Sequence, residues 1–236
     1  MRSVLALLQF CTTLPLGRVV DLEHFARRSY LYPIAGYLIG GIAAIVTFWI
    51  ASPPVGAAVA IAAVLLLSGC NHFDGLLDLG DGLMAHGGRE KRIAAMTDRT
   101  TGAGAVAAGI LVTLLAFSGL QAVANIPLTI LTAEVCAKTA MSWLTTLGRP
   151  FREGIHSYLH SFAKPWFLVP AFLLTLPLFL LPLPRLALVL ALAATAAITA
   201  LMLVLSRRVF GGVNGDIVGA SNEIVRAGVI LLLALA

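Results

Sequence analysis

Long apolar runs alternate with short polar segments along the whole chain, which is the pattern of a protein that crosses a membrane several times as helices. A crossing helix needs about 20 mostly apolar residues. Six runs approach that length, and the predicted spans cover residues 31–51, 55–70, 103–123, 128–147, 166–181 and 186–205. The first span carries Gly36, Gly40 and Gly41, which predict a small-residue face for close packing against another helix.

Two apolar pieces near the ends of the chain are shorter than a span. Residues 3–10 precede the first polar segment, and residues 224–236 would be roughly 20 Å long as a helix. Whether either piece crosses the membrane stays open. No internal repeat or linker divides the chain. We therefore expect one domain over residues 1–236, an all-α integral membrane protein built as a polytopic bundle of about six to seven transmembrane helices with cytoplasmic active-site loops.

Composition and charge add location and orientation to this picture. Hydrophobic residues make up 59% of the chain and charged residues 11%, whereas soluble domains carry about 25% charged residues. The net charge of +5 does not indicate nucleic-acid binding, because the basic residues concentrate in alternate loops, namely residues 1–30, 82–102, 148–165 and 206–222. Such basic loops usually face the cytoplasm. We expect a multi-pass protein of the cell membrane, embedded in the lipid bilayer.

An acidic run follows the second predicted span. Asp74, Asp78 and Asp81 are three of the chain's 11 acidic residues and fall within eight positions. In a helix they stand at i, i+4 and i+7, so the three carboxylates share one face. Like charges at this spacing repel each other, which favours a cation between them. Carboxylate oxygens suit Mg²⁺, which often keeps a phosphate-bearing substrate among its ligands. The run therefore predicts an enzyme that handles a diphosphate through a metal.

Further polar residues follow the acidic run and are candidates for the same site. Arg92 and Arg99 could contact phosphate. Arg99 is the better candidate because it precedes an expected helix start, whereas Arg92 is equally typical of a loop that sets membrane orientation. Asp98 could complete a second metal position. His72 or a free carboxylate could act as the base for a hydroxyl nucleophile.

Two polar pairs lie farther along the chain. Glu134 and Lys138 stand at i and i+4 inside a predicted span. Ionisable residues within a membrane helix indicate function by default, so we expect them to contact substrate, with a structural ion pair as the alternative. Asn214 and Asp216 lie among the glycines of the last predicted polar loop, residues 206–223. That loop would either let the backbone approach a ligand or serve only as a flexible turn.

Two of these motifs resemble a known family. Residues 72–83 resemble the H-x-D-G-L-x-D-x-x-D-G-L motif of the cobalamin synthase family. Residues 211–220 are similar to that family's G-G-x-x-G-D-x-x-G-A loop, and Met96 and Asp98 match its M-x-D segment. Thr13 stands where the family usually has an arginine in its F-x-T-R-x-P opening, so an anion contact from that position is not expected here.

The resemblance implies an activity and a set of site residues. The family joins adenosylcobinamide-GDP to α-ribazole, or to its 5′-phosphate, and releases GMP with Mg²⁺ as cofactor. Asp74, Asp78 and Asp81 would bind the Mg²⁺ and take part in catalysis, with His72 and Asp98 as further catalytic candidates. Phosphate or nucleotide contacts are expected from the following residues: Arg92, Arg99, Asn214 and Asp216. The form of the acceptor and the number of subunits stay open, and a homo-oligomer is compatible with the sequence.

Other classes of membrane protein use similar residues. A lipid-headgroup transferase with a CDP-activated donor would carry D-G-x-x-A-R, but Asp78 stands where that pattern has alanine. An aspartate-rich prenyltransferase would carry N-D-x-x-D, but Asn71 is followed by His72. A transporter would place its acidic groups near the membrane midplane instead of clustering them at one surface. The sequence therefore favours the transferase suggested by the resemblance.

Overall fold

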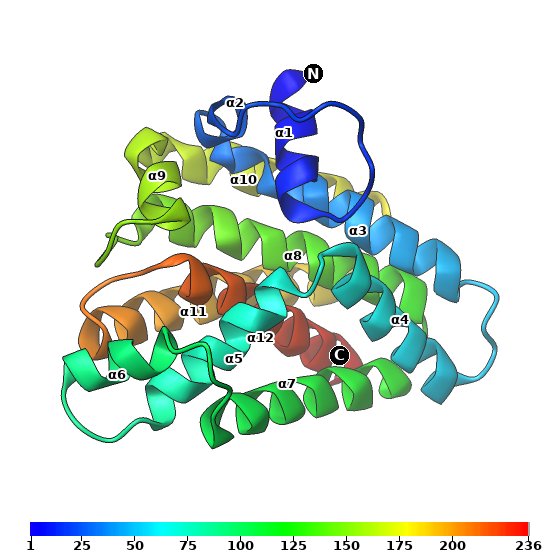
Figure 1. The fold of residues 1–236 in the computed structure, drawn as a ribbon. Helices are drawn as coiled ribbons and strands as arrows, with labels where there is room; N and C mark the ends of the chain where they lie inside the picture. The colour runs from blue at the N-terminus through cyan, green and yellow to red at the C-terminus, as the bar shows by residue number, and fades with distance from the viewer. Residues whose placement is uncertain (236) are drawn as a thin grey trace.

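The computed structural model describes residues 1–235, and the regular elements in this range are all helices (Figure 1). The α-helices are α1 (Arg2–Cys11), α2 (Glu23–Ala26), α3 (Tyr32–Thr47), α4 (Pro53–Leu67), α5 (Asn71–Met84), α6 (Arg89–Met96), α7 (Ala103–Ala122), α8 (Ile126–Leu147), α9 (Ile155–Phe162), α10 (Leu168–Leu173), α11 (Arg185–Val209) and α12 (Gly215–Leu235). The short 3-10 helices are η1 (Ser29–Leu31), η2 (Pro165–Phe167) and η3 (Leu176–Leu180).

Helix α8 forms the centre of the bundle, between α3 and the pair α11 and α12 (Figure 1). The predicted small-residue face of α3 is confirmed at two of its three positions. A Cβ atom on Gly36 would come within 2.7 Å of the Glu134 carbonyl oxygen, and one on Gly40 within 2.9 Å of the Leu131 Cα. A Cβ on Gly41 would meet no atom within 4 Å. The close crossing of α3 and α8 therefore depends on Gly36 and Gly40.

The helices confirm the predicted multi-pass membrane protein. Four are long and apolar enough to cross a membrane, namely Ser29–Thr47, Ala103–Ala122, Arg185–Val209 and Gly215–Leu235. Two strongly bent pairs, α4 with α5 and α9 with the 165–180 segment, raise the number to six if each pair is one span. Helix α8 has 22 residues but is not in this set. Its charged and hydroxyl-bearing residues lower its hydropathy.

Two predicted spans differ from the helices observed. The predicted span over residues 166–181 is not one helix but the short pieces η2, α10 and η3, and Pro177 near the start of η3 prevents α10 from continuing. The predicted span over residues 55–70 does not run straight into the acidic helix, because α4 and α5 meet at an angle of 95°. The acidic run itself is helical, as predicted, over Asn71–Met84.

The end of the chain also differs from the prediction. The last polar loop ends at Asn214, not at residue 223, because α12 begins at Gly215. The apolar run at residues 224–235 is thus the second half of a 21-residue helix that is long enough to cross a membrane. At the other end, α1 has only ten residues and packs its buried side chains, including Leu7 and Cys11, onto the bundle.

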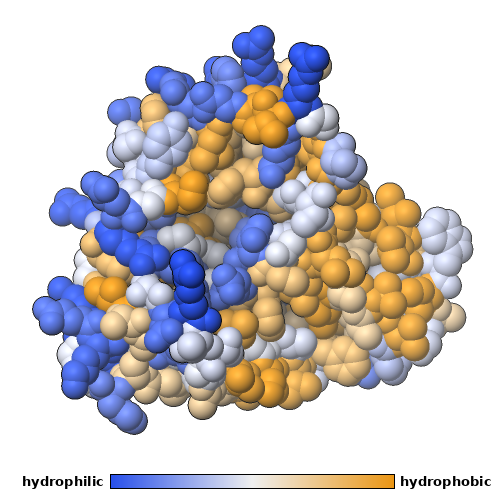
Figure 2. Space-filling view, viewed as in Figure 1, coloured by the Kyte–Doolittle hydropathy of each residue, from blue (hydrophilic) through white to orange (hydrophobic). Residues whose placement is uncertain are grey.

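Polar and apolar residues separate on the molecular surface. Figure 2 shows hydrophilic side chains over the half of this face that carries α2, α6 and α9, and an apolar surface over α4 and the adjoining part of α7. The polar half is hollowed near its centre (Figure 2). An apolar surface of this extent is stable in contact with lipid, so the polar half is the part of the molecule exposed to water.

Candidate active site

The acidic helix begins at a sharp break in the chain. Gly69 and Cys70 both adopt positive φ angles, of 62° and 57°, which ends α4 and redirects the chain into α5. Thr13 completes the break, because its amide donates to the Leu67 carbonyl at 2.8 Å and its hydroxyl to the Leu66 carbonyl at 3.1 Å. In this chain, Thr13 therefore supplies hydrogen-bond donors to the last carbonyl groups of α4.

Helices α5 and α12 cross at two glycines. A Cβ atom on Gly75 would lie 2.6 Å from the Asp216 carbonyl oxygen, and one on Gly219 would lie 3.2 Å from the His72 Cα. The glycines of the two family motifs thus have a shared physical role, because small residues let two backbones approach closely. The crossing places Asp74 of α5 and Asp216 of α12 at the same cavity.

A carboxylate-rich cavity of about 370 Å³ opens beside this crossing. Five of its lining residues are acidic: Asp74, Asp78, Asp81, Asp98 and Asp216. Arg99 and Arg152 also line it and supply positive charge. The structure therefore brings together the three predicted aspartates of α5 with Asp98, Asp216 and Arg99, which lie far apart in the sequence. The carboxylates repel one another and favour a cation or an arginine between them.

Two of these carboxylates are already engaged by backbone amides. The Asp81 oxygens accept from the Gly102 and Ala105 amides, each at 2.8 Å, and thereby cap the start of α7. Asp98 is exposed and accepts from the amide and hydroxyl of Thr100 at 2.9 and 2.8 Å. These hydrogen bonds from Thr100 hold the pKa of the Asp98 carboxyl below its usual range.

The start of α12 is fixed by its neighbours. Asn214 is buried, and its side-chain oxygen accepts from the Ile217 amide at 3.1 Å while its amide group donates to Asp216. Asp216 also pairs with Arg152 at 3.4 Å. Arg152 comes close because the loop after α8 is bridged to Val213: the Val213 amide donates to the Arg149 carbonyl at 2.8 Å. Asn214 therefore orients Asp216.

The donor set fits Mg²⁺ bound jointly by protein and substrate. Asp74, Asp78 and Asp216 offer carboxylate oxygens to the cavity without the backbone contacts that occupy Asp81. Among the described residues, no three His, Cys, Asp or Glu side chains come close enough to hold a metal ion by themselves. Mg²⁺ is usually bound through one or two carboxylates together with water and phosphate, so an ion in this cavity would need ligands from the substrate.

Glu134 and Lys138 lie in a buried ion network instead of a cavity. The Lys138 ammonium pairs with Glu134 at 3.4 Å and donates to Asn222 at 2.7 Å, and Arg226 pairs with both Glu134 and Glu223. Two positive and two negative charges balance between α8 and α12. The structure therefore shows the ion pair that was the structural alternative for Glu134 and Lys138, and a substrate contact from either residue stays a prediction.

Two further predicted residues lie outside the carboxylate cavity. Arg92 donates to the Leu83 carbonyl at 2.6 Å and to the Gly87 carbonyl at 3.3 Å, so it closes the end of α5 and lines a different, basic surface cavity. The predicted phosphate contact is therefore not supported at this position. His72 lies on the other side of the α5–α12 crossing, where it is buried and lines a second cavity.

The sequence pattern alone does not reveal the roles of Arg152 in the cavity or of Asn222, Glu223 and Arg226 in the buried ion network. In the sequence, Arg152 is one of several basic residues in a polar loop. In the structure, the bridge between Pro150 and Val213 brings it to Asp216. The hydropathy pattern predicts a loop at Asn222 and Glu223 and an apolar run around Arg226. The available signal was the same one that drew attention to Glu134, namely ionisable residues within an otherwise apolar segment.

The fold and the site define a polytopic, all-helical membrane protein that builds a carboxylate- and arginine-lined cavity at its polar side. Such a cavity is suited to a metal-assisted reaction of phosphate groups. The chain belongs to the cobalamin-5-phosphate synthase family, whose model matches residues 3–234.

Curated relatives agree with this assignment. A protein of Methanocella arvoryzae named adenosylcobinamide-GDP ribazoletransferase is 35% identical to the chain, over 94% of this chain and 91% of the relative. Proteins of the same name from Halorubrum lacusprofundi and Deinococcus radiodurans are each 36% identical, covering 93% and 90% of this chain and 91% and 78% of the relatives. No solved structure matches the chain significantly.

Proposed function

We propose that this protein joins a ribazole acceptor to the cobinamide phosphate of adenosylcobinamide-GDP and releases GMP. In this reaction a ribose hydroxyl oxygen forms a bond to the phosphorus that carries the cobinamide. The bond from that phosphorus to the bridging oxygen breaks, and GMP leaves with that oxygen. Family membership and the cavity that combines carboxylates with two arginines are the observations that support this proposal.

Some residues of the cavity neutralise the charge of the diphosphate, and one accepts a proton. Arg99 and Arg152 bind the non-bridging oxygens of the diphosphate, since guanidinium groups match phosphate geometry. Asp74 and Asp78 would bind Mg²⁺ together with phosphate oxygens of the substrate, while Asp216 holds Arg152 at the cavity and Asp81 fixes the start of α7. Bound Mg²⁺ supplies Lewis-acid stabilisation of the charge on the diphosphate. A cavity carboxylate accepts the proton of the attacking hydroxyl.

Release of GMP tests the reaction directly. The full-length protein in liposomes should release GMP from adenosylcobinamide-GDP only when ribazole is added. The variant Asp74→Asn should lose at least a hundredfold in rate, because it removes a charge from the cavity but no hydrogen bond that holds the fold. An unchanged thermal midpoint would show that the variant is folded. GMP release at the wild-type rate by this variant would refute the role of Asp74.

The orientation in the membrane is also part of the proposal: the basic loops and the cavity face the cytoplasm. Cys70 offers a native probe because it is exposed at the break between α4 and α5, whereas Cys11 and Cys136 are buried. A membrane-impermeant maleimide should label Cys70 in inverted membrane vesicles and not in intact spheroplasts. Cys70→Ser is the control for labelling at any other position. Labelling from the outside only would reverse the proposed orientation.

A further inference from the structure

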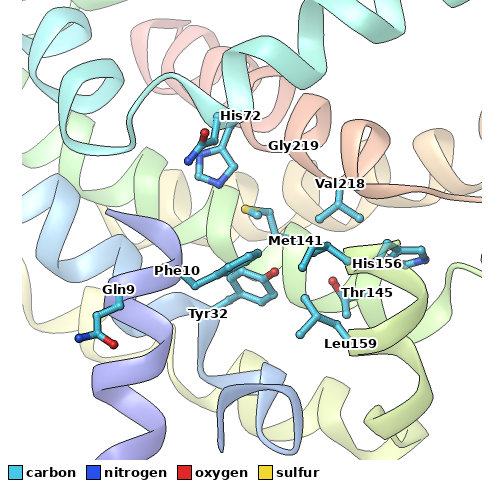
Figure 3. Close-up of a pocket in the computed structure, with 13 residues that line it drawn as sticks. Gln9, Phe10, Tyr32, His72, Met141, Thr145, His156, Leu159, Val218 and Gly219 are labelled. Atoms are coloured by element: carbon cyan, nitrogen blue, oxygen red, sulfur yellow. The ribbon is translucent and has the colours of Figure 1, made fainter. Parts of the chain in front are cut away.

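A second cavity of about 400 Å³ lies on the opposite side of the α5–α12 crossing from the carboxylates. Its walls come from α1, α3, α5, α8, α9 and α12. Large apolar side chains form much of the lining: Phe10, Tyr32, Met141, Leu159 and Val218 (Figure 3). A cavity of this size that combines large apolar side chains with several polar groups, among them Asn71, His72 and Thr145, is typical of a site for a small organic molecule.

Three buried polar atoms of this lining have no partner. They are the Nδ1 atoms of His72 and His156 and the hydroxyl oxygen of Thr145, whose side chains are 6%, 3% and 0% exposed. Figure 3 shows the His72 ring reaching into the space from α5 while Tyr32, Met141 and Thr145 approach from the other side. Native structures rarely leave buried hydrogen-bonding groups without a partner. Their concentration around one cavity indicates a ligand that completes them.

The position of this cavity connects it to the carboxylates. Asn71 and His72 line it, and two residues farther along α5 Asp74 lines the carboxylate cavity. On α12, Gly215 lines it and the adjacent Asp216 lines the carboxylate cavity. The two cavities are therefore lined by neighbouring residues of the same two helices, so a molecule bound in the second cavity is a neighbour of the carboxylates.

We propose that this second cavity is the acceptor site, which binds the planar aromatic base of a ribonucleoside among Phe10, Tyr32 and Met141. The hydroxyl of Thr145 donates to the ring nitrogen of the base that is not attached to ribose, and His72 bonds the ribose. This inference rests on the proposed function, because it assigns the ribazole to one of two neighbouring cavities. It makes Thr145 a specificity-determining residue of the reaction.

Size and chemistry distinguish this occupant from the other parts of the substrates. A corrin macrocycle with its side chains is far larger than 400 Å³. The polar edge of guanine presents several N–H groups, and the lining places no carboxylate opposite them; its amide groups are those of Asn71 and of Gln9, which already bonds the backbone of Arg18 and Val20. A mostly apolar bicyclic base with a single free ring nitrogen needs only aromatic contacts and one donor, which the cavity provides.

Binding of α-ribazole to the full-length protein in detergent, without the GDP-bearing substrate, tests the assignment independently of turnover. The variant Thr145→Val keeps the shape of the side chain and removes only its hydroxyl group, which is buried at the cavity beside Tyr32. It should keep or raise the thermal midpoint while raising the dissociation constant for α-ribazole about three- to tenfold. In turnover, KM for ribazole should rise by the same factor, and KM for adenosylcobinamide-GDP should not change.

A further variant tests the cavity by narrowing it, and a matched variant serves as its control. Ile155 lines the cavity and is 49% exposed, so Ile155→Trp should narrow the space without disturbing the core and weaken α-ribazole binding more than tenfold. Tyr158→Trp, on the same helix but outside the lining, is the matched control and should bind normally.

The outcomes separate this inference from the proposed function. If wild-type protein releases GMP in a ribazole-dependent way but both cavity variants bind α-ribazole normally, the acceptor-site inference is wrong and the function stands. If the variants weaken binding of GMP instead of α-ribazole, the cavity holds the guanine nucleotide and the inference is also wrong. If α-ribazole binding is weakened as expected but the wild-type protein releases no GMP from adenosylcobinamide-GDP, the cavity assignment stands and the proposed reaction fails.

Discussion

Asp81 differs from its two neighbours on the acidic face of α5, and this difference leads to a sharp prediction about stability. Its two carboxylate oxygens accept from the Gly102 and Ala105 amides at 2.8 Å, which are backbone donors at the start of α7 without partners inside that helix. In Asp81→Asn, one side-chain oxygen remains and the amide NH₂ group faces the other backbone N–H. One hydrogen bond is lost and two donors are placed against each other.

The expected cost follows from these two bonds. Removal of a helix-capping side chain costs about 0.5–2 kcal/mol, and a part-buried donor left without a partner costs about 1–3 kcal/mol. Together these two effects should lower the free energy of unfolding by about 2 kcal/mol. For a chain of this length that corresponds to a thermal midpoint lower by roughly 4–8 °C.

Thermal unfolding of the full-length protein in detergent, with Asp78→Asn as the matched control, measures this difference. Asp78 lies on the same face of α5 and no hydrogen bond to its side chain is observed among the described residues. Both variants replace a carboxylate on the same face of α5 by an amide, so the difference between their thermal midpoints reports chiefly the contacts to α7. A midpoint for Asp81→Asn equal to that of Asp78→Asn would refute the capping role of Asp81.

Three further variants or treatments test other parts of the structure. Gly75→Ala should lower both GMP release, by more than tenfold, and the thermal midpoint, because its Cβ would lie 2.6 Å from the Asp216 carbonyl oxygen; wild-type values would contradict the close crossing. Arg226→Met should cost about 3–5 kcal/mol by leaving two buried carboxylates with one lysine, and adding Glu223→Gln should recover part of this loss in the same unfolding assay. Chelation by EDTA should stop GMP release and added Mg²⁺ should restore it; activity that persists in EDTA would exclude the metal.

The acidic helix was predictable because its signal is local. Asp74, Asp78 and Asp81 share a face by helical periodicity alone, and the structure confirms a helix over Asn71–Met84. The angle of this helix was not predictable, because the break depends on the positive φ angles at Gly69 and Cys70 and on contacts from Thr13, more than 50 residues away in the sequence.

Helix boundaries failed where polar residues lie inside the bundle. Hydropathy assigned Asn222 and Glu223 to a loop, but both are buried within α12. Their polarity is satisfied by Lys138 and Arg226, partners that a scan along the chain does not reveal. A buried charge is stable only beside its counter-charge. Such a helix can therefore be recognised only when the helix that carries the opposite charges is also known.

The sequence by itself determined that this is a multi-pass helical membrane protein with clustered aspartates on one helix and a glycine-rich segment near its end. Those properties depend on composition and on the spacing of residues along single helices. Only the tertiary structure decided that Asp216, Arg99 and Arg152 join the aspartates in one cavity while Glu134 and Lys138 do not, and that a second cavity adjoins the first. These arrangements depend on where helices cross, and crossing is set by the fit of small residues and buried charges between segments far apart in the chain.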